Sequence, residues 1–207
     1  TGIRDGKVIG NVKTSETNAT ALARMMVGRE VLLRVEKNDA RPGSTLLIVS
    51  NFSVKGTDGS NRVKGVSFEV HSGEIVGIAG VSGNGQQELL YAISGEGPLA
   101  EKFPVQICGI ETGRMMPGRR RKAGLCFVPE ERLGRGAVPS MSLSENAILT
   151  AAKTRGFVRN GLLDFAAARA FAADCIHKYN VKCGGPQAQA RSLSGGNLQK
   201  FIVGREV

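Results

Sequence analysis

Short apolar segments alternate with polar, turn-forming stretches in the first two thirds of the chain. Residues Thr45–Val54 and Val63–Val70 are rich in β-branched residues, and the stretch between them contains Gly, Asn and Asp. This pattern predicts two strands joined by a turn. Glu74–Ala79 and Leu125–Val128 are short and almost wholly apolar, which is typical of strands buried on both faces of a sheet. These four segments are therefore predicted to be strands.

Helical periodicity interrupts these strands and dominates the last third of the chain. A helix is predicted over Gln86–Ser94, because its apolar residues share one side and Gly95 follows as a stop. Ser142 and Glu145 have the spacing of a capping box, which predicts the start of another helix. Residues 164–178 are alanine-rich and predict a third helix.

The two ends of the sequence have their own patterns. A last helix is predicted after Ser194, which has the chemistry of an N-cap. Its buried stripe consists of Leu198, Phe201 and Ile202. At the N-terminal end, residues 1–12 predict a short strand pair and residues 17–26 predict a helix. The polar stretch Glu36–Gly43 predicts a linker between two parts of the chain.

Composition changes this picture little. The chain has 207 residues, of which 41% are hydrophobic and 22% charged, and these values are typical of a globular protein. No apolar run approaches the roughly 20 residues that span a bilayer. The first residues contain no apolar leader and no initiator Met, so we expect an internal segment of a longer chain. The four cysteines lack CxxC spacing, which predicts reduced cytosolic thiols and no structural zinc site.

Positive charge is concentrated in one region. The formal net charge is +10, and residues 113–135 hold seven basic and two acidic side chains. Such a region can be a solvated face, a partner surface or a nucleic-acid contact. No aromatic residue interrupts Arg119–Lys122 to stack on bases, which argues against nucleic acid.

The segment Gly80–Gln87 has the glycine spacing of a loop that binds phosphate. It follows a predicted strand and precedes a predicted helix, which is the context that such a loop requires. Where a phosphate loop has Lys and then Ser or Thr, this chain has Gln86 and Gln87. The pattern therefore predicts either a phosphate site without its cation or a simple glycine turn.

Four segments resemble one known family when they are taken in order. Leu193–Lys200 resembles the signature motif of ATP-binding cassette (ABC) ATPases, in its LSGGN form. Phe127–Arg132 resembles the variant Q-loop of the second cassette in double-cassette importer ATPases for sugars and nucleosides. Gly77–Leu90 resembles the degenerate Walker A of that cassette, and residues 1–31 resemble the end of the first cassette. Within the family, the sequence is most similar to nucleoside importers that work with binding lipoproteins.

The resemblance implies a fold and a domain plan. The fold class is α/β, with a P-loop NTPase core of the ABC type, an antiparallel β subdomain and a helical signature subdomain. Residues 1–35 would be the C-terminal tail of the first cassette, and 36–43 the linker. Residues 44–128 would form the β subdomain and P-loop core of the second cassette. Residues 129–207 would hold the Q-loop and the helical subdomain, and end at the signature helix before the Walker B strand.

The resemblance also implies two half-sites for ATP. In the family, each ATP lies between the Walker A of one cassette and the signature of the other. The expected nucleotide contacts of the degenerate half-site are Gly80, Ser82, Gly83, Asn84, Gly85, Gln86, Gln87 and Glu130. Those of the signature half-site, which completes the other ATP site, are Leu193, Ser194, Gly195, Gly196 and Asn197. No catalytic residue and no metal ligand is expected within this sequence.

The degenerate half-site is expected to bind nucleotide weakly and to hydrolyse it poorly. A neutral Gln86 cannot replace the ammonium of a Lys on the β- and γ-phosphates. Gln87 would have to replace a hydroxyl on Mg²⁺. The Glu130 carboxylate repels a triphosphate unless Mg²⁺ or the nearby Arg132 compensates.

The implied activity is ATP hydrolysis, with Mg²⁺, that drives uptake of a nucleoside or a sugar. The expected partners are transmembrane permease subunits near residues 129–165, the first cassette, and indirectly a periplasmic or lipoprotein solute-binding protein. The expected location is the cytoplasmic face of the membrane, as a peripheral subunit, and this segment alone is expected to be inactive. The alternatives are a non-transport ABC-type ATPase that binds nucleic acid and a nucleotide-free structural or regulatory module, although no direct nucleic-acid contact is expected.

Overall fold

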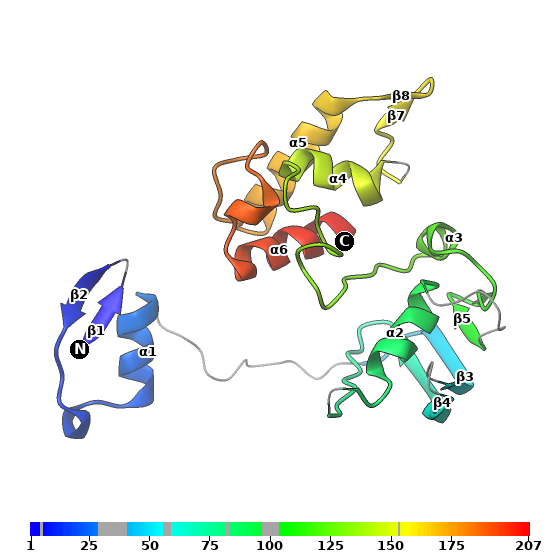
Figure 1. The fold of residues 1–207 in the computed structure, drawn as a ribbon, viewed down its shortest axis with the longest axis horizontal. Coiled ribbons are helices and arrows are strands. Elements are labelled where there is room, and N and C mark those ends of the chain that lie inside the picture. Colours follow the sequence, from blue (N-terminus) through cyan, green and yellow to red (C-terminus); the bar gives the residue numbers. More distant parts are fainter. Residues whose placement is uncertain (5, 29–40, 56–58, 82, 97–103, 153) are drawn as a thin grey trace. The chain divides into compact units, whose positions relative to one another are not determined.

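A computed structural model describes the chain except for residues 5, 29–40, 56–58, 82, 97–103 and 153 (Figure 1). The described residues form two compact units, Thr1–Pro42 and Gly43–Val207. The linker predicted over Glu36–Gly43 lies largely outside the described residues. Each unit is therefore treated by itself.

The N-terminal unit is a small strand pair with one helix. Its elements are β1 (Gly2–Arg4), β2 (Lys7–Gly10), the 3-10 helix η1 (Thr14–Glu16) and α1 (Ala19–Val27). β1 and β2 are antiparallel, as predicted. The Asn18 side chain caps α1 by accepting a hydrogen bond from the Ala21 N–H at 2.9 Å. Gly28 ends the helix with φ 78°, a backbone conformation that glycine adopts without steric cost.

An antiparallel sheet forms the first part of the larger unit. Its strands are β3 (Thr45–Lys55), β4 (Asn61–His71), β5 (Val105–Ile107) and β6 (Ile110–Glu111), in the order β4-β3-β5-β6. The helix α2 (Gln86–Ser94) packs its Leu89 against this sheet, in a core that includes Val49 and Val105. Phe52 is fully buried in the same core.

The two predicted buried strands are not strands in the structure. Glu74–Ala79 and Leu125–Val128 have no assigned ladder partner among the described residues. Ile75 and Ile78 are 84% and 55% exposed, instead of being buried on both faces. A strand exists only when a neighbour completes its hydrogen bonds, and no described segment does so here. Leu125 and Val128 instead pack against the sheet core and the helical core, respectively.

Helices dominate the last part of the chain. The elements are α3 (Pro117–Lys122), α4 (Leu143–Ala151), β7 (Val158–Arg159), β8 (Leu162–Leu163), α5 (Phe165–Lys178), η2 (Ala190–Ser192) and α6 (Gly195–Glu206). The predicted capping box is confirmed, because Ser142 and Glu145 bond to each other's backbone N–H groups. α4, α5 and α6 pack together around Leu198, Phe201 and Ile202 (Figure 1).

The basic stretch predicted as a possible surface is partly internal. Arg120 is 1% exposed, and its guanidinium donates to the carbonyls of Ala92 and Ile93 at the end of α2 and to that of Met115. Burial lowers the pKa of Arg120, and these carbonyl acceptors replace water around its charge. Arg121 pairs with Glu206. Two of the four basic residues are therefore used to hold the fold.

Candidate functional site

The glycine loop leads into α2 as predicted, but the strand predicted before it is absent among the described residues. Gly83 and Gly85 have φ values of 88° and 98°, in the left-handed region that favours glycine. Gly85 is the N-cap of α2, so the first N–H groups of that helix face the loop. A Cβ on Gly85 would lie 2.4 Å from the Arg62 carbonyl oxygen of β4, so only glycine lets the loop approach that strand. The candidate Ser82 lies outside the described residues.

Neither glutamine brings charge to the loop. The Gln86 Nε2 atom donates to the Val81 carbonyl at 3.1 Å, and a Cβ on Gly80 would lie 2.4 Å from that nitrogen. The amide thus folds back over the loop, where a phosphate loop would extend a Lys. The Gln87 Nε2 atom donates to the Tyr91 hydroxyl at 2.8 Å. This hydrogen bond directs the Nε2 side of the amide along α2.

Residues of the glycine loop and Glu130 line the same cleft. It has a volume of about 560 Å³ and is lined by Arg62, Gly80, Gly83, Gly85, Gln86, Gln87, Glu88 and Glu130. Arg62 reaches it from β4, where its Nη1 atom donates to the Gly83 carbonyl at 3.4 Å. Arg62 is the only cation among these lining residues. Sequence reasoning missed Arg62, because it stands on a strand far from the loop and its position follows from packing alone.

A second cleft of about 360 Å³ lies between α2 and the residues that follow Val128. The Arg135 guanidinium stacks on the Tyr91 ring, 4.6 Å from its centroid, and hydrogen-bonds to the Tyr91 hydroxyl. Its Nη2 atom also pairs with Glu96 at 2.7 Å. These contacts tie α2 to the segment after Glu130. No motif in the sequence indicated Tyr91 or Arg135.

The signature candidates begin helix α6. Ser194 is its N-cap, and the Ser194 hydroxyl accepts a hydrogen bond from Asn197 Nδ2 at 2.9 Å, not from the helix backbone. Ser194, Gly195 and Gly196 are exposed, whereas Leu193 is buried in the helical core. The helix N-terminus thus presents a hydroxyl and backbone N–H groups to solvent, an arrangement that favours an anion.

Arg132 lies at the signature helix. A Cβ on Gly195 would be 3.1 Å from the Arg132 Nη1 atom. Arg132 is one of the two groups that could compensate the charge of Glu130, but it is absent from the lining of the cleft that holds Glu130. Its cation therefore stands at the opposite half-site, beside the first residue of α6.

The described residues contain neither a membrane-spanning helix nor a cluster of metal-binding side chains. No helix in the described ranges is both long and apolar enough to cross a bilayer. Among the same residues, no three or more His, Cys, Asp or Glu side chains gather in a group that could hold a metal ion.

Comparison with known proteins gives the following relatives. No family model matches the sequence. Over its whole length the chain is 36% identical to the guanosine import ATP-binding protein NupO of Bacillus subtilis and 35% identical to the nucleoside import ATP-binding protein NupA of Lactococcus lactis. Over 99% of its length it is 37% identical to the ribose import ATP-binding protein RbsA 1 of Streptomyces avermitilis. The chain covers 40%, 41% and 38% of these three proteins.

Solved structures show the same fold. A dimeric bacterial ABC transporter cassette matches 78% of this chain with a TM-score of 0.60 and 20% identity, over 69% of its own length. The ADP form of an ATP-binding cassette of an ABC transporter matches 79% of this chain with a TM-score of 0.59 and 18% identity, over 64% of its own length. The chain is thus a homologue, along its whole length, of nucleoside and sugar import ATP-binding proteins, and its fold is that of an ABC ATPase cassette.

Proposed function

We propose that the chain is the second-cassette part of an ATPase that drives import of a nucleoside or a sugar. The observation that carries this proposal is the joint presence of a glycine loop at the start of α2 and an exposed LSGGN turn at the start of α6. The relatives named above are import ATP-binding proteins for guanosine, nucleosides and ribose. The chain spans about two fifths of their length, so activity belongs to the full-length protein.

The glycine loop forms a half-site that holds ATP with little hydrolysis. The amides of the loop and of the first turn of α2 bind phosphate oxygens. Arg62 supplies positive charge at the edge of the cleft in place of the missing Lys. Magnesium would find its oxygen ligands in the Gln87 amide and the Glu130 carboxylate, and both residues line this cleft. One neutral amide oxygen and one carboxylate are a weak ligand set for Mg²⁺, which fits the slow hydrolysis that we propose for this half-site.

The signature turn completes the other ATP site. The Ser194 hydroxyl donates to the γ-phosphate, and the Gly195 and Gly196 N–H groups stabilise charge at the N-terminus of α6. Leu193, buried in the helical core, anchors this turn. Asn197 orients the Ser194 hydroxyl through its Nδ2 atom.

The partners follow from this role. The first cassette supplies the Walker A that faces the signature turn. Permease subunits dock against residues 129–165, and this contact places the protein on the cytoplasmic face of the membrane. A solute-binding protein acts indirectly, through the permease.

The test uses the full-length protein reconstituted with its permease. Ser194→Ala removes a hydrogen bond to a charged group, so ATP hydrolysis and solute uptake should both fall roughly tenfold to a hundredfold. Ser192→Ala is the matched control, since the Ser192 hydroxyl is engaged with the Gln189 carbonyl at 2.7 Å. Wild-type hydrolysis in Ser194→Ala would contradict the proposed function.

A further inference from the structure

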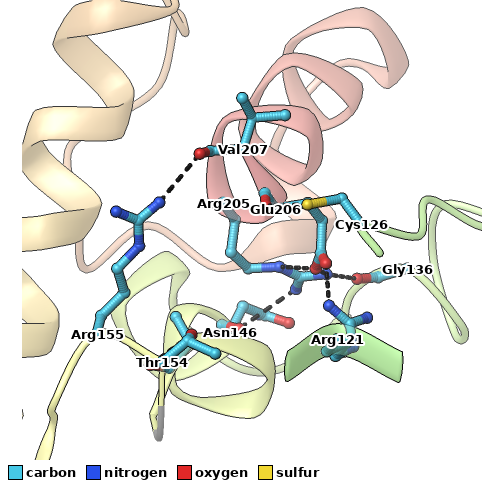
Figure 2. A network of polar contacts seen from close by, with 10 residues as sticks. Arg121, Cys126, Gly136, Asn146, Thr154, Arg155, Arg205, Glu206 and Val207 are labelled. Atoms are coloured by element: carbon cyan, nitrogen blue, oxygen red, sulfur yellow. Dashed lines mark hydrogen bonds and ion pairs between the residues drawn. The ribbon is translucent and has the colours of Figure 1, made fainter. Parts of the chain in front are cut away.

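The buried end of α6 carries two opposite charges. The Arg205 and Glu206 side chains expose only 3% and 1% of their surface. The other end of the same helix, Ser194–Gly196, is exposed. Buried charge is costly unless it is paired and hydrogen-bonded. The partners of these two residues therefore decide how the helix is held (Figure 2).

Arg205 joins α6 to two other segments. Its Nη2 atom donates to the Gly136 carbonyl at 2.9 Å, and its Nη1 atom donates to the Asn146 carbonyl at 3.3 Å. Asn146 is fully buried, and its side chain bonds to the backbone of Val138 in both directions. Burial lowers the pKa of Arg205, and the Glu206 carboxylate opposes that shift. Arg205 thus contacts backbone positions that are themselves fixed.

Glu206 joins α6 to the part of the unit that carries the glycine loop. Its Oε1 atom accepts from Arg205, and its Oε2 atom pairs with Arg121 of α3. Its carbonyl accepts from the Cys126 thiol at 2.8 Å. Figure 2 shows Glu206 between Arg205 and Arg121, with Cys126 alongside. Arg120 precedes Arg121 in α3, and its guanidinium donates to the carbonyls of Ala92 and Ile93 at the end of α2.

The loop after Glu130 also follows α6 along its length. A Cβ on Gly136 would lie 2.9 Å from the Ile202 Cδ1 atom, and Arg132 contacts the position of Gly195 at the start of the helix. A helix of 12 residues is about 18 Å long. Contacts at Gly195 and at Ile202, which lie in different turns of the helix, restrict the tilt of α6 as well as its position.

We propose that Arg121, Arg205 and Glu206 are positioning residues that clamp the last turn of α6. The clamp fixes the end of α6 that lies opposite the exposed Ser194–Gly196 turn, and so positions that turn through the helix that carries it. This inference rests on the proposed function of the signature turn, because it concerns how that turn is presented to ATP.

Arg121→Met tests the clamp in the full-length protein reconstituted with its permease. The Arg121 side chain is 25% exposed, and Glu206 keeps its pair with Arg205 when Arg121 is removed. We expect kcat for ATP hydrolysis to fall about fivefold to tenfold while KM for ATP stays within about twofold, since presentation is lost and binding groups remain. Arg119→Met, which removes the same charge from an exposed position of α3, should leave kcat unchanged.

Two further variants separate positioning from simple loss of structure. Arg121→Lys keeps the pairing charge and should recover at least about half of kcat. Arg121→Met combined with Glu206→Gln should cost no more in kcat than Glu206→Gln alone, because Glu206→Gln already removes the charge with which Arg121 pairs. Arg121→Met and Arg121→Lys should both still unfold in one cooperative transition, although Arg121→Met loses one partner of the buried Glu206 carboxylate.

The outcomes are distinct. Wild-type kcat in Arg121→Met, additive losses in the double variant, or no recovery with Arg121→Lys would each overturn the clamp. If Ser194→Ala impairs hydrolysis and Arg121→Met does not, the clamp alone is wrong. If Ser194→Ala has no effect, the proposed function fails, and the clamp fails with it.

Discussion

The segment that leads into the glycine loop and the signature helix α6 differ in how deeply their apolar side chains are buried. In the segment Glu74–Val81, Ile75 is 84% exposed and Val81 is 75% exposed. In α6, Leu198 and Phe201 are at most 1% exposed. The signature helix is anchored by a packed core and by buried charges. The glycine loop is held by a close backbone approach to β4 and by the start of α2.

This difference separates stability from binding in the two half-sites. Burial of large apolar side chains contributes most to the free energy of unfolding, so the signature helix should be sensitive to truncation. The lead-in to the glycine loop has little buried surface to lose. Truncations in this lead-in should therefore have small effects on the free energy of unfolding.

The largest expected effect is on the helical core. Phe201→Ala should lower the free energy of unfolding by about 3–5 kcal/mol, because it leaves a cavity among packed residues. Ile78→Ala in the lead-in to the loop should lower it by less than about 1 kcal/mol, since Ile78 is already 55% exposed. Urea unfolding measures both. Equal losses would mean that the two regions are held alike.

The next effect concerns the backbone of the loop. Gly85→Ala should cost about 3 kcal/mol, because it combines a positive φ with a clash against the Arg62 carbonyl. Gly83→Ala is the matched control, with positive φ but no atom within 4 Å of its Cβ, and should cost about 1 kcal/mol. Thermal unfolding and ATP titration of both variants check this. Similar costs would show that β4 does not support the loop.

Restoring the cation should strengthen binding at the glycine loop. Gln86→Lys should tighten Mg-ATP binding roughly tenfold to a hundredfold, because hydrogen bonds to charged groups are worth about 1.5–3 kcal/mol. Calorimetry on the full-length protein measures the change. Thr14→Lys adds the same charge in the other unit and serves as the control. If neither wild type nor Gln86→Lys binds at this loop, the loop is a structural turn.

The smallest effect concerns the capping box of α4. The Ser142 backbone and hydroxyl donate to Glu145, and these bonds lower the pKa of its carboxyl. Because the folded pKa is depressed, the stabilisation is present above the unfolded pKa of about 4.3 and is lost as pH falls through the folded value. The unfolding midpoints of wild type and Glu145→Gln should differ at pH 7 and converge at acid pH. A constant difference would mean that the charge of Glu145 contributes nothing.

Local chemistry made most elements predictable from sequence. The capping box, the alanine-rich α5 and the apolar stripe of α6 depend on residues three or four positions apart, so a short window contains their cause. The glycine loop is of the same kind, since its backbone geometry needs glycine at specific positions.

Only the tertiary structure decided what depends on distant partners. Glu74–Ala79 has strand composition but no ladder, because a strand requires a neighbour that its own residues do not specify. The sequence also did not determine the environment of each arginine. Arg120 is buried, Arg62 lines the cleft, and Arg132 lies beside Gly195. A charge in the sequence has the same formal value everywhere, whereas its role depends on the solvent and the partners that folding leaves around it.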